Sequence, residues 1–349
     1  MGWITLQCAV QGRGHLSSNT PCQDKTFSVV KDACSVCALA DGAGSAKLSH
    51  FGAEAVTQAI CDYMAENFDS VIDGDGVSVK KGILDIVGAR LNALCDEKGC
   101  AIRDLASTLL FVAEKAGKFI ICHVGDGVIG YVKDGRVLVA SHPENGEFAN
   151  TTVFTTSSDA IASMKLIKGN LNQISGFVLM SDGTETCFYN KRTRALSPSL
   201  ARLVKLVAIC DADYMSQKLN NTFENLVKQK TSDDCSIVLM SRLAGGKGYI
   251  DFSERDKCDL LGLAYTRASR KRLKGFEDAL MALRSWGTYR ATKRRLHLRG
   301  KKLDRILERL VNANLLQARE DGRYKSALRA FLLPQFLCKD CHQLGKERT

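Results

Sequence analysis

The sequence predicts an α+β fold, a layered sandwich of sheets and helices, followed by a small helical C-terminal domain. Three observations support this prediction. Apolar runs of strand type and of helix type occur in blocks without strict alternation, which argues against a doubly wound parallel sheet. The 349 residues, 45% of them hydrophobic, are enough for one large domain and a smaller one. Residues 1–250 carry 25 Lys and Arg against 26 Asp and Glu, whereas residues 251–349 carry 24 against 12.

The first part begins with strands and continues with helices. The segments "WITLQCAVQG" (3–12), "TFSVV" (26–30) and "CSVCALA" (34–40) are short runs of β type. The spacing of apolar residues then changes to that of a helix in "FGAEAVTQAICDYMAENF" (51–68) and in a second segment around residues 80–95.

The next segment predicts a meander of strands. In residues 105–141, apolar runs are separated by "EKAG", "GDG" and "KDG", and the last two have the turn chemistry of hairpins. We then expect helices at about 198–209 and 213–228, which separate the strands "GFVLMS" (176–181) and "CSIVLMS" (235–241).

The change in charge locates a domain boundary. It coincides with "LAGGKGY" (243–249), a glycine-rich segment typical of a linker. We therefore expect a large first domain at residues 1–242, a linker at 243–250 and a basic domain with a C-terminal tail at 251–349.

The cysteines and the apolar segments indicate a cytoplasmic protein without contact to a membrane. No window reaches the roughly 18 uninterrupted apolar residues of a membrane span, and no signal peptide is recognisable. The 14 cysteines are dispersed and often lie in apolar runs, as reduced core thiols do. Two pairs have Cys-x-x-Cys spacing, Cys34 with Cys37 and Cys338 with Cys341. The second pair is followed by His342, which gives the spacing of a haem-attachment motif, but haem attachment would require export of the protein. A zinc site would require a second matching pair of cysteines, and the sequence has none.

Acidic residues recur where apolar strands meet loops. They are Asp24, Asp41, Asp126, Asp182 and the pair Asp233–Asp234. Convergent carboxylates of this kind can hold hard divalent cations such as Mg²⁺ and Mn²⁺. Asp-Gly is also a common hairpin turn, and we interpret "KDG" (133–135) in that way.

In this order, the segments resemble the metal-dependent serine/threonine protein phosphatases of type 2C, especially their bacterial branch. The resemblance covers most of residues 5–241. It is carried by "GRGHLSSNTPCQDK", "ALADGAGSA", "ASTLL", "CHVGDGVIGYVKDG", "VLMSDGTET" and "SDDCSIVLM", and "ENGEFANTTVF" (144–154) is also typical of that branch. The resemblance implies an αββα-type sandwich for the first part.

The resemblance also implies a set of metal ligands for two Mn²⁺ or Mg²⁺ ions and a more labile third ion. Asp41 would bridge two ions, and Gly42 would offer its backbone carbonyl. Asp182 and Asp233 would hold the first ion, and Asp126 would contribute to the third site. Two close cations neutralise a phosphate dianion and lower the pKa of a bridging water, so a hydroxide can attack phosphorus in line without a protein nucleophile.

Further roles follow from the same resemblance. Asp24 would act from behind the metal ligands, and Asp234 stands where the family often has Asn, so its side chain would orient the neighbouring loop. The general acid stays open between His15 and His50, because a single His is often structural.

The sequence departs from the family at two positions. The family commonly has an Arg that grips the substrate phosphate five residues before its first Asp, and here this position is Asn19. Arg13 or His15 could replace that Arg in binding the substrate. Thr186 replaces an acid four residues after Asp182, so the third metal site would lack that acid.

The basic part resembles a winged helix. Three helical segments, within residues 270–287, 289–300 and 301–315, precede a hairpin with its turn at "EDGR". Leu303, Ile306, Leu307 and Leu310 have core-facing spacing. The exposed faces carry Lys301, Lys302, Arg305 and Arg309, which could grip phosphates of a nucleic acid or dock on an acidic protein such as a cognate Ser/Thr kinase.

Two hypotheses follow. The first is a Mn²⁺- or Mg²⁺-dependent phosphatase that acts on phosphoserine and phosphothreonine in proteins. The second is a catalytically weak regulator that binds phosphoproteins or DNA through its basic domain, and Asn19, Thr186 and the charge distribution motivate it.

Overall fold

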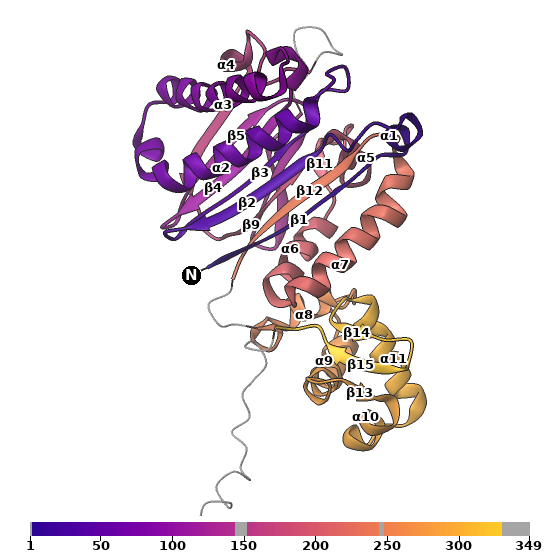
Figure 1. The fold of residues 1–349 in the computed structure, drawn as a ribbon. Helices are drawn as coiled ribbons and strands as arrows, with labels where there is room; N and C mark the ends of the chain where they lie inside the picture. The colour runs from indigo at the N-terminus through magenta and orange to yellow at the C-terminus, as the bar shows by residue number, and fades with distance from the viewer. Residues whose placement is uncertain (1, 144–151, 244–247, 330–349) are drawn as a thin grey trace, which may run out of the picture. The chain divides into compact units, whose positions relative to one another are not determined.

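The structure, a computed structural model, describes residues 2–143, 152–243 and 248–329 (Figure 1). It divides into two compact units. The first comprises Met1–Ala208 and Ala212–Leu243, and the second comprises Ile209–Asp211 and Ala244–Thr349. Cys338 and Cys341, like most of the "ENGEFANTTVF" segment, lie outside the described residues. Among the described residues, no helix is both long enough and apolar enough to cross a membrane.

Two antiparallel five-stranded sheets form the centre of the first unit. One has the order β1-β12-β9-β6-β7 and the other the order β2-β3-β4-β5-β8. The strands of the first sheet are β1 (Trp3–Val10), β12 (Cys235–Arg242), β9 (Ile174–Met180), β6 (Val128–Lys133) and β7 (Arg136–Ser141). Those of the second are β2 (Lys25–Lys31), β3 (Cys34–Ala40), β4 (Leu109–Lys115), β5 (Lys118–Val124) and β8 (Lys165–Asn170).

Helices cover the outer faces of both sheets (Figure 1). The long helices α2 (Ser49–Asp73) and α3 (Gly76–Lys98) belong to one apolar cluster with the second sheet. On the first sheet, Ser241 of β12 donates a hydrogen bond to the Val204 carbonyl of α6 (Ser199–Ile209), and α7 (Ala212–Thr222) contacts β1. The α+β layered sandwich is confirmed.

Alternate side chains of β3 build two different cores. Val36 and Ala38 pack toward the helices, whereas Cys37 and Leu39 pack between the two sheets. All seven residues of β3 are buried, which explains why "CSVCALA" is apolar throughout. Cys34 faces the helices and Cys37 the other sheet, so this pair does not form a metal site.

The prediction of a hairpin at "GDG" is wrong. β5 pairs with β4 and β8, whereas β6 pairs with β7 and β9 in the other sheet. Residues 125–127 therefore carry the chain from one sheet to the other. The turn at "KDG" is a hairpin as expected, since Lys133 pairs with Arg136 and Asp134 and Gly135 have φ values of 50° and 73°.

Short elements complete the first unit. They are α1 (Arg13–Ser18), the 3₁₀ turn Ile102–Leu105, α4 (Ala160–Ser163), α5 (Asp182–Phe188), β10 (Tyr189–Asn190) and β11 (Ala195–Leu196). The helix expected at 213–228 ends as α7 at Thr222. A π-helical turn, Phe223–Val227, and a 3₁₀ turn, Lys228–Lys230, follow it.

The second unit combines helices with a three-stranded sheet of order β13-β15-β14. Its elements are the 3₁₀ turn Tyr249–Asp251, α8 (Glu254–Leu260), α9 (Arg267–Ala282), β13 (Gly287–Thr288), α10 (Tyr289–Leu296), α11 (Gly300–Asn312), β14 (Leu316–Ala318) and β15 (Arg323–Ser326). Leu303, Ile306, Leu307 and Leu310 form the buried face of α11.

Candidate active site

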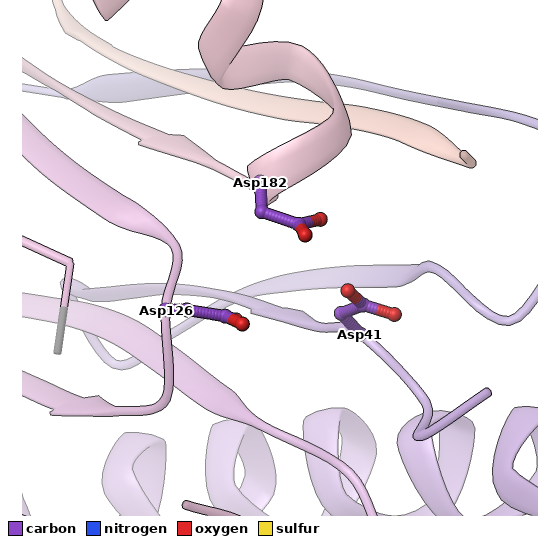
Figure 2. A group of neighbouring side chains, drawn as sticks. All are labelled: Asp41, Asp126 and Asp182. Atoms are coloured by element: carbon purple, nitrogen blue, oxygen red, sulfur yellow. The ribbon is translucent and has the colours of Figure 1, made fainter. Parts of the chain in front are cut away.

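Three carboxylates converge where the two sheets meet their loops (Figure 2). Asp41 directly follows β3, Asp126 lies between β5 and β6, and Asp182 is the first residue of α5 after β9. One oxygen of each carboxylate lies within 4.8 Å of the others. Three elements that are distant in the sequence thus contribute one acid each to a single cluster.

The backbone fixes these positions through close contacts. The Asp41 amide donates to Thr108 Oγ1 at 2.8 Å, and the Thr108 amide donates to the Asp41 carbonyl at 2.8 Å. Gly125 has a φ of 115°, which only glycine adopts readily, and it lets the chain change sheets at Asp126. A Cβ on Gly183 would overlap the Asp234 carbonyl, so glycine is required for the start of α5 to pack against β12.

A cavity of about 200 Å³ contains the cluster. Polar side chains dominate its lining, and its entire wall lies in the first unit. The lining residues are His15, Gln23, Asp41, Gly42, Ala43, Gly44, Thr108, Asp126, Thr152, Phe154, Asp182 and Asp233. Among these residues there is no Lys or Arg, so no permanent positive charge balances the four aspartates.

The electrostatics of the cluster favour a bound cation. Burial, followed by repulsion from Asp126 and Asp233, raises the pKa of Asp182 to about 7. Burial and the neighbouring aspartates, Asp24 first among them, raise the pKa of Asp41 well above its ordinary range. Asp182 Oδ1 is buried and has no hydrogen-bond partner among the described residues. An all-oxygen donor set with an unsatisfied oxygen fits a hard divalent cation.

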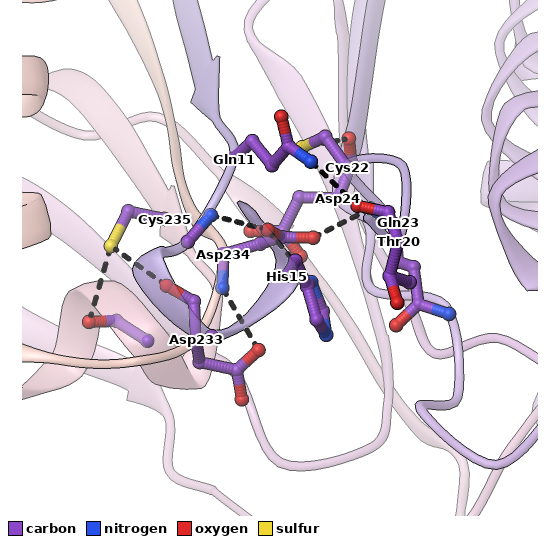
Figure 3. A network of polar contacts seen from close by, with 12 residues as sticks. Gln11, His15, Thr20, Cys22, Gln23, Asp24, Asp233, Asp234 and Cys235 are labelled. Atoms are coloured by element: carbon purple, nitrogen blue, oxygen red, sulfur yellow. Dashed lines mark hydrogen bonds and ion pairs between the residues drawn. The ribbon is translucent and has the colours of Figure 1, made fainter. Parts of the chain in front are cut away.

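A second acidic network lies beside the cluster (Figure 3). Asp234 is 1% exposed and accepts hydrogen bonds from the amides of Gly12 and Gln23, each at 2.6 Å. His15 Nδ1 lies 2.9 Å from Asp234 Oδ1. Asp234 therefore connects the segment after β1, which includes His15 of α1, to the start of β12.

Asp24 lies behind the cluster. It is 1% exposed, and Ser181 Oγ donates to its Oδ2 at 2.7 Å. Burial, with repulsion from the nearby Asp234 as a smaller cause, raises the pKa of Asp24 to about 8. Because Ser181 immediately precedes Asp182, this bond holds the junction of β9 and α5 that carries one of the cluster acids.

A family model described as protein phosphatase 2C matches residues 11–224, which is more than half of the chain. This chain belongs to the protein phosphatase 2C family. It is a serine/threonine protein phosphatase, and phosphoproteins are its substrates. The family is metal-dependent, in agreement with the acidic cluster.

Individual relatives resemble the phosphatase domain at low identity. Serine/threonine-protein phosphatase 3 of Escherichia coli (strain K12) is 25% identical over 197 residues, which are 54% of this chain and 77% of the relative. The structure of the serine/threonine phosphatase Stp1 from Staphylococcus aureus is 16% identical with a TM-score of 0.47, covering 69% of this chain and 96% of that one. A C. elegans sex determining protein is 13% identical with a TM-score of 0.50, covering 69% and 65%.

Most of the predicted site residues of the phosphatase lie together. His15, Asp41, Gly42, Asp126, Asp182 and Asp233 all line the cavity, and Asp24 lies behind it. Arg13 and Asn19 are not among the lining residues. Arg13 is exposed and its Nε donates to the Thr231 carbonyl at 3.1 Å, and Asn19 ends α1 with a φ of 55°.

His50 also lies outside the cavity lining. Its ring contacts the Phe51 ring in a tilted arrangement with centroids 4.2 Å apart, and burial lowers the pKa of His50. The sequence interpretation missed Gln23, Thr108 and Thr152 as lining residues. Thr152 donates to Asp126 Oδ2 at 2.5 Å. Thr108 and Thr152 belong to "ASTLL" and "ENGEFANTTVF", segments that carried the family resemblance, and this was the signal that could have identified them.

Proposed function

We propose that the chain hydrolyses phosphoserine and phosphothreonine with Mn²⁺ or Mg²⁺ bound at the aspartate cluster. The convergence of Asp41, Asp126 and Asp182 in one polar cavity carries this proposal. Asp41 would serve two ions, with Asp182, Asp233 and the Gly42 carbonyl as further ligands, and Asp126 would serve an additional ion. Such ions, when bound, neutralise the phosphate dianion and lower the pKa of an attacking water.

The chain's own residues position the reactants and move protons. His15 lines the cavity, and the Asp234 carboxylate beside its Nδ1 favours one ring orientation. From there His15 can deliver a proton to the oxygen of the departing serine or threonine. Gln23 lines the same cavity, and its Nε2 donates to Ser49 Oγ at 2.7 Å, which fixes its amide group.

Hydrolysis of a phosphopeptide by the purified chain tests this proposal. We expect turnover only with added Mn²⁺ or Mg²⁺, and a loss of at least about a hundredfold in Asp41→Asn and Asp182→Asn, since even residues that only support metal ligands contribute up to that factor. Asp134→Asn, in the β6–β7 hairpin, is the matched control and should keep full activity. Calorimetric titration with Mn²⁺ gives a readout that does not depend on turnover. Unchanged rates and unchanged Mn²⁺ binding in both cluster variants would contradict the assignment.

The second unit supports an additional role in partner binding. Its order of helix, strand, two helices and hairpin, with the sheet order β13-β15-β14, is typical of a winged helix, and we assign it that form. Lys301, Lys302, Arg305 and Arg309 are exposed on α11, opposite its buried leucines. The candidate partners are a nucleic acid, an acidic protein and, among proteins, a cognate Ser/Thr kinase.

We propose domain boundaries at residues 1–242, 243–250 and 251–349. We also propose that the chain belongs to the bacterial branch of the family, which the Escherichia coli relative supports.

A further inference from the structure

Helices α9 and α11 of the second unit enclose a groove with a volume of about 530 Å³. Its apolar lining includes Phe276 of α9 and Ile306 of α11, both 6% exposed. Gly275 leaves a free space between Phe276 and Ile306, because it has no side chain. A Cβ at residue 275 would already be in van der Waals contact with Ile306, at 3.5 Å from its Cδ1. A larger side chain at residue 275 would therefore occupy space that is now free.

Five basic side chains surround this apolar lining. Lys271 and Arg272 come from α9, and Lys302, Arg305 and Arg309 come from α11, all of them exposed. Glu308 is the single acid that lines the groove. Within residues 248–329, no hydrogen bond or ion pair involves the side chains of these five cations. These five charges therefore remain available for ion pairs with an anionic ligand.

We propose that this groove binds an acidic peptide segment of a partner protein, with a large apolar side chain seated between the helices. The carboxylates of the segment would contact the basic rim, and the apolar side chain would fill the space beside Gly275, against the exposed edges of Phe276 and Ile306. This combination is the helix-lined groove with apolar anchors and charged flanks that peptides commonly use. The inference does not depend on the phosphatase chemistry, because the groove lies entirely within the second unit.

The shape of the groove favours a peptide over duplex DNA. Duplex DNA presents phosphates on a convex backbone and offers no aliphatic side chain for a concave apolar lining. Phe276 is buried and therefore presents no open ring face on which a base could stack. Both ligands carry negative charges that complement the basic rim. Only the peptide also carries an apolar side chain that fits the apolar lining.

Binding of fluorescent probes to the full chain tests the proposal. The probes are a short synthetic glutamate-rich peptide with one central leucine, the same peptide with serine in place of leucine, and a duplex DNA of random sequence. We expect the leucine peptide to bind about tenfold more tightly than the serine peptide, since burial of one leucine is worth roughly a factor of that size or more. Equal affinity for both peptides, or tighter binding of DNA than of the leucine peptide, would overturn the proposal.

Paired variants locate the binding site. The double variant Arg305→Glu with Arg309→Glu should weaken leucine-peptide binding at least about tenfold. The control, Arg290→Glu with Arg294→Glu on α10, makes the same change in net charge at exposed residues outside the groove lining. Equal losses in the two double variants would show that general charge attraction, not the groove, holds the peptide.

A third comparison changes the shape of the groove without changing its charge. Gly275→Met should fill the apolar space and abolish the preference for leucine over serine, whereas Gly275→Ala should retain it. Both variants remove a glycine from the middle of a helix, so their folding should be preserved, as circular dichroism can verify. A folded Gly275→Met variant that still prefers the leucine peptide would contradict the proposed seat.

Discussion

At the scale of single residues, the aspartate cluster makes the metal-free protein sensitive to pH. Burial and like charges raise the pKa of Asp182 to about 7 and that of Asp41 well above its ordinary range. In the unfolded chain both groups ionise near pH 4. Between these values the folded state binds more protons than the unfolded state, so its free energy of unfolding falls as the pH rises.

Metal binding should restore the stability that the metal-free protein loses as the pH rises. We expect the melting temperature of chelator-treated protein to fall between about pH 5 and pH 8. Added Mn²⁺ should raise it more at about pH 8 than at about pH 6, because fewer protons must then be displaced from the ligands. Thermal scans with and without Mn²⁺ measure both effects.

The variant Asp182→Asn provides the control for this prediction. It removes a buried carboxylate, so in chelator at high pH it should melt above the parent protein, and it should respond little to Mn²⁺. A parent-like response of Asp182→Asn to Mn²⁺ would place the ion at another site.

Asp234 offers a second prediction at this scale. Asp234→Ala leaves the buried Gly12 and Gln23 amides without their acceptors, and each such loss costs about 1–3 kcal/mol. We expect destabilisation of at least about 2 kcal/mol in urea unfolding, with lower phosphopeptide turnover because His15 and Gln23 line the cavity. Asp234→Asn keeps one acceptor oxygen and should be intermediate. If the alanine variant were as stable as the parent, these two hydrogen bonds would not hold the loop.

At the scale of the elements, the passage from β5 to β6 is the feature that places Asp126. The sequence predicted a hairpin there because Asp-Gly between apolar runs is a local hairpin signal. The two neighbouring runs instead join different sheets, so the turn at residues 125–127 spans the sandwich. Which strand pairs with which is decided by the tertiary structure. No local sequence pattern therefore distinguishes Asp126–Gly127 from Asp134–Gly135 in the β6–β7 hairpin.

Glycine substitutions in these two Asp-Gly turns should separate function from stability. A Cβ on Gly127 would lie 2.6 Å from the Met180 carbonyl oxygen, so Gly127→Ala must shift the backbone beside Asp126 and should strongly reduce turnover. Gly135→Ala, at a φ of 73°, should cost about 1 kcal/mol of stability and leave turnover intact. Turnover and thermal unfolding of both variants check this. Equal turnover in the two variants would mean that the position of Asp126 is not critical.

The sequence predicted some elements of the fold and of the site but not others. The long helices, the buried strand β3 and the order of the acidic motifs followed from apolar spacing and from the family resemblance. The strand β8, Lys165–Asn170, and the short helix α1 were missed, because their sequences "KLIKGN" and "RGHLSS" lack a clear apolar period. Thr108 and Thr152 were missed as lining residues because single hydroxyl side chains are frequent in all loops and strand ends.

At the scale of the whole molecule, charge is divided between the two parts of the chain. Residues 1–250 have a net charge of −1, and residues 251–349 have a net charge of +12. In our proposal the acidic cluster performs chemistry on a small group, whereas a basic surface attracts acidic macromolecules over a longer range that salt shortens. This division predicts that the basic part selects the partner and leaves the chemistry to the first part.

Removal of residues 250–349 tests that division. The shortened protein should hydrolyse a small aryl phosphate with Mn²⁺ at a rate close to that of the full chain, because this substrate requires only the metal site. Its activity on an acidic phosphoprotein should fall and lose its dependence on salt, since exposed charges act over only about 8–10 Å at physiological ionic strength. Paired rate measurements at low and high salt on both substrates provide the comparison. An unfolded product, or an equal loss on the aryl phosphate, would mean that the basic part belongs to the catalytic fold and that the boundary at 243–250 is wrong.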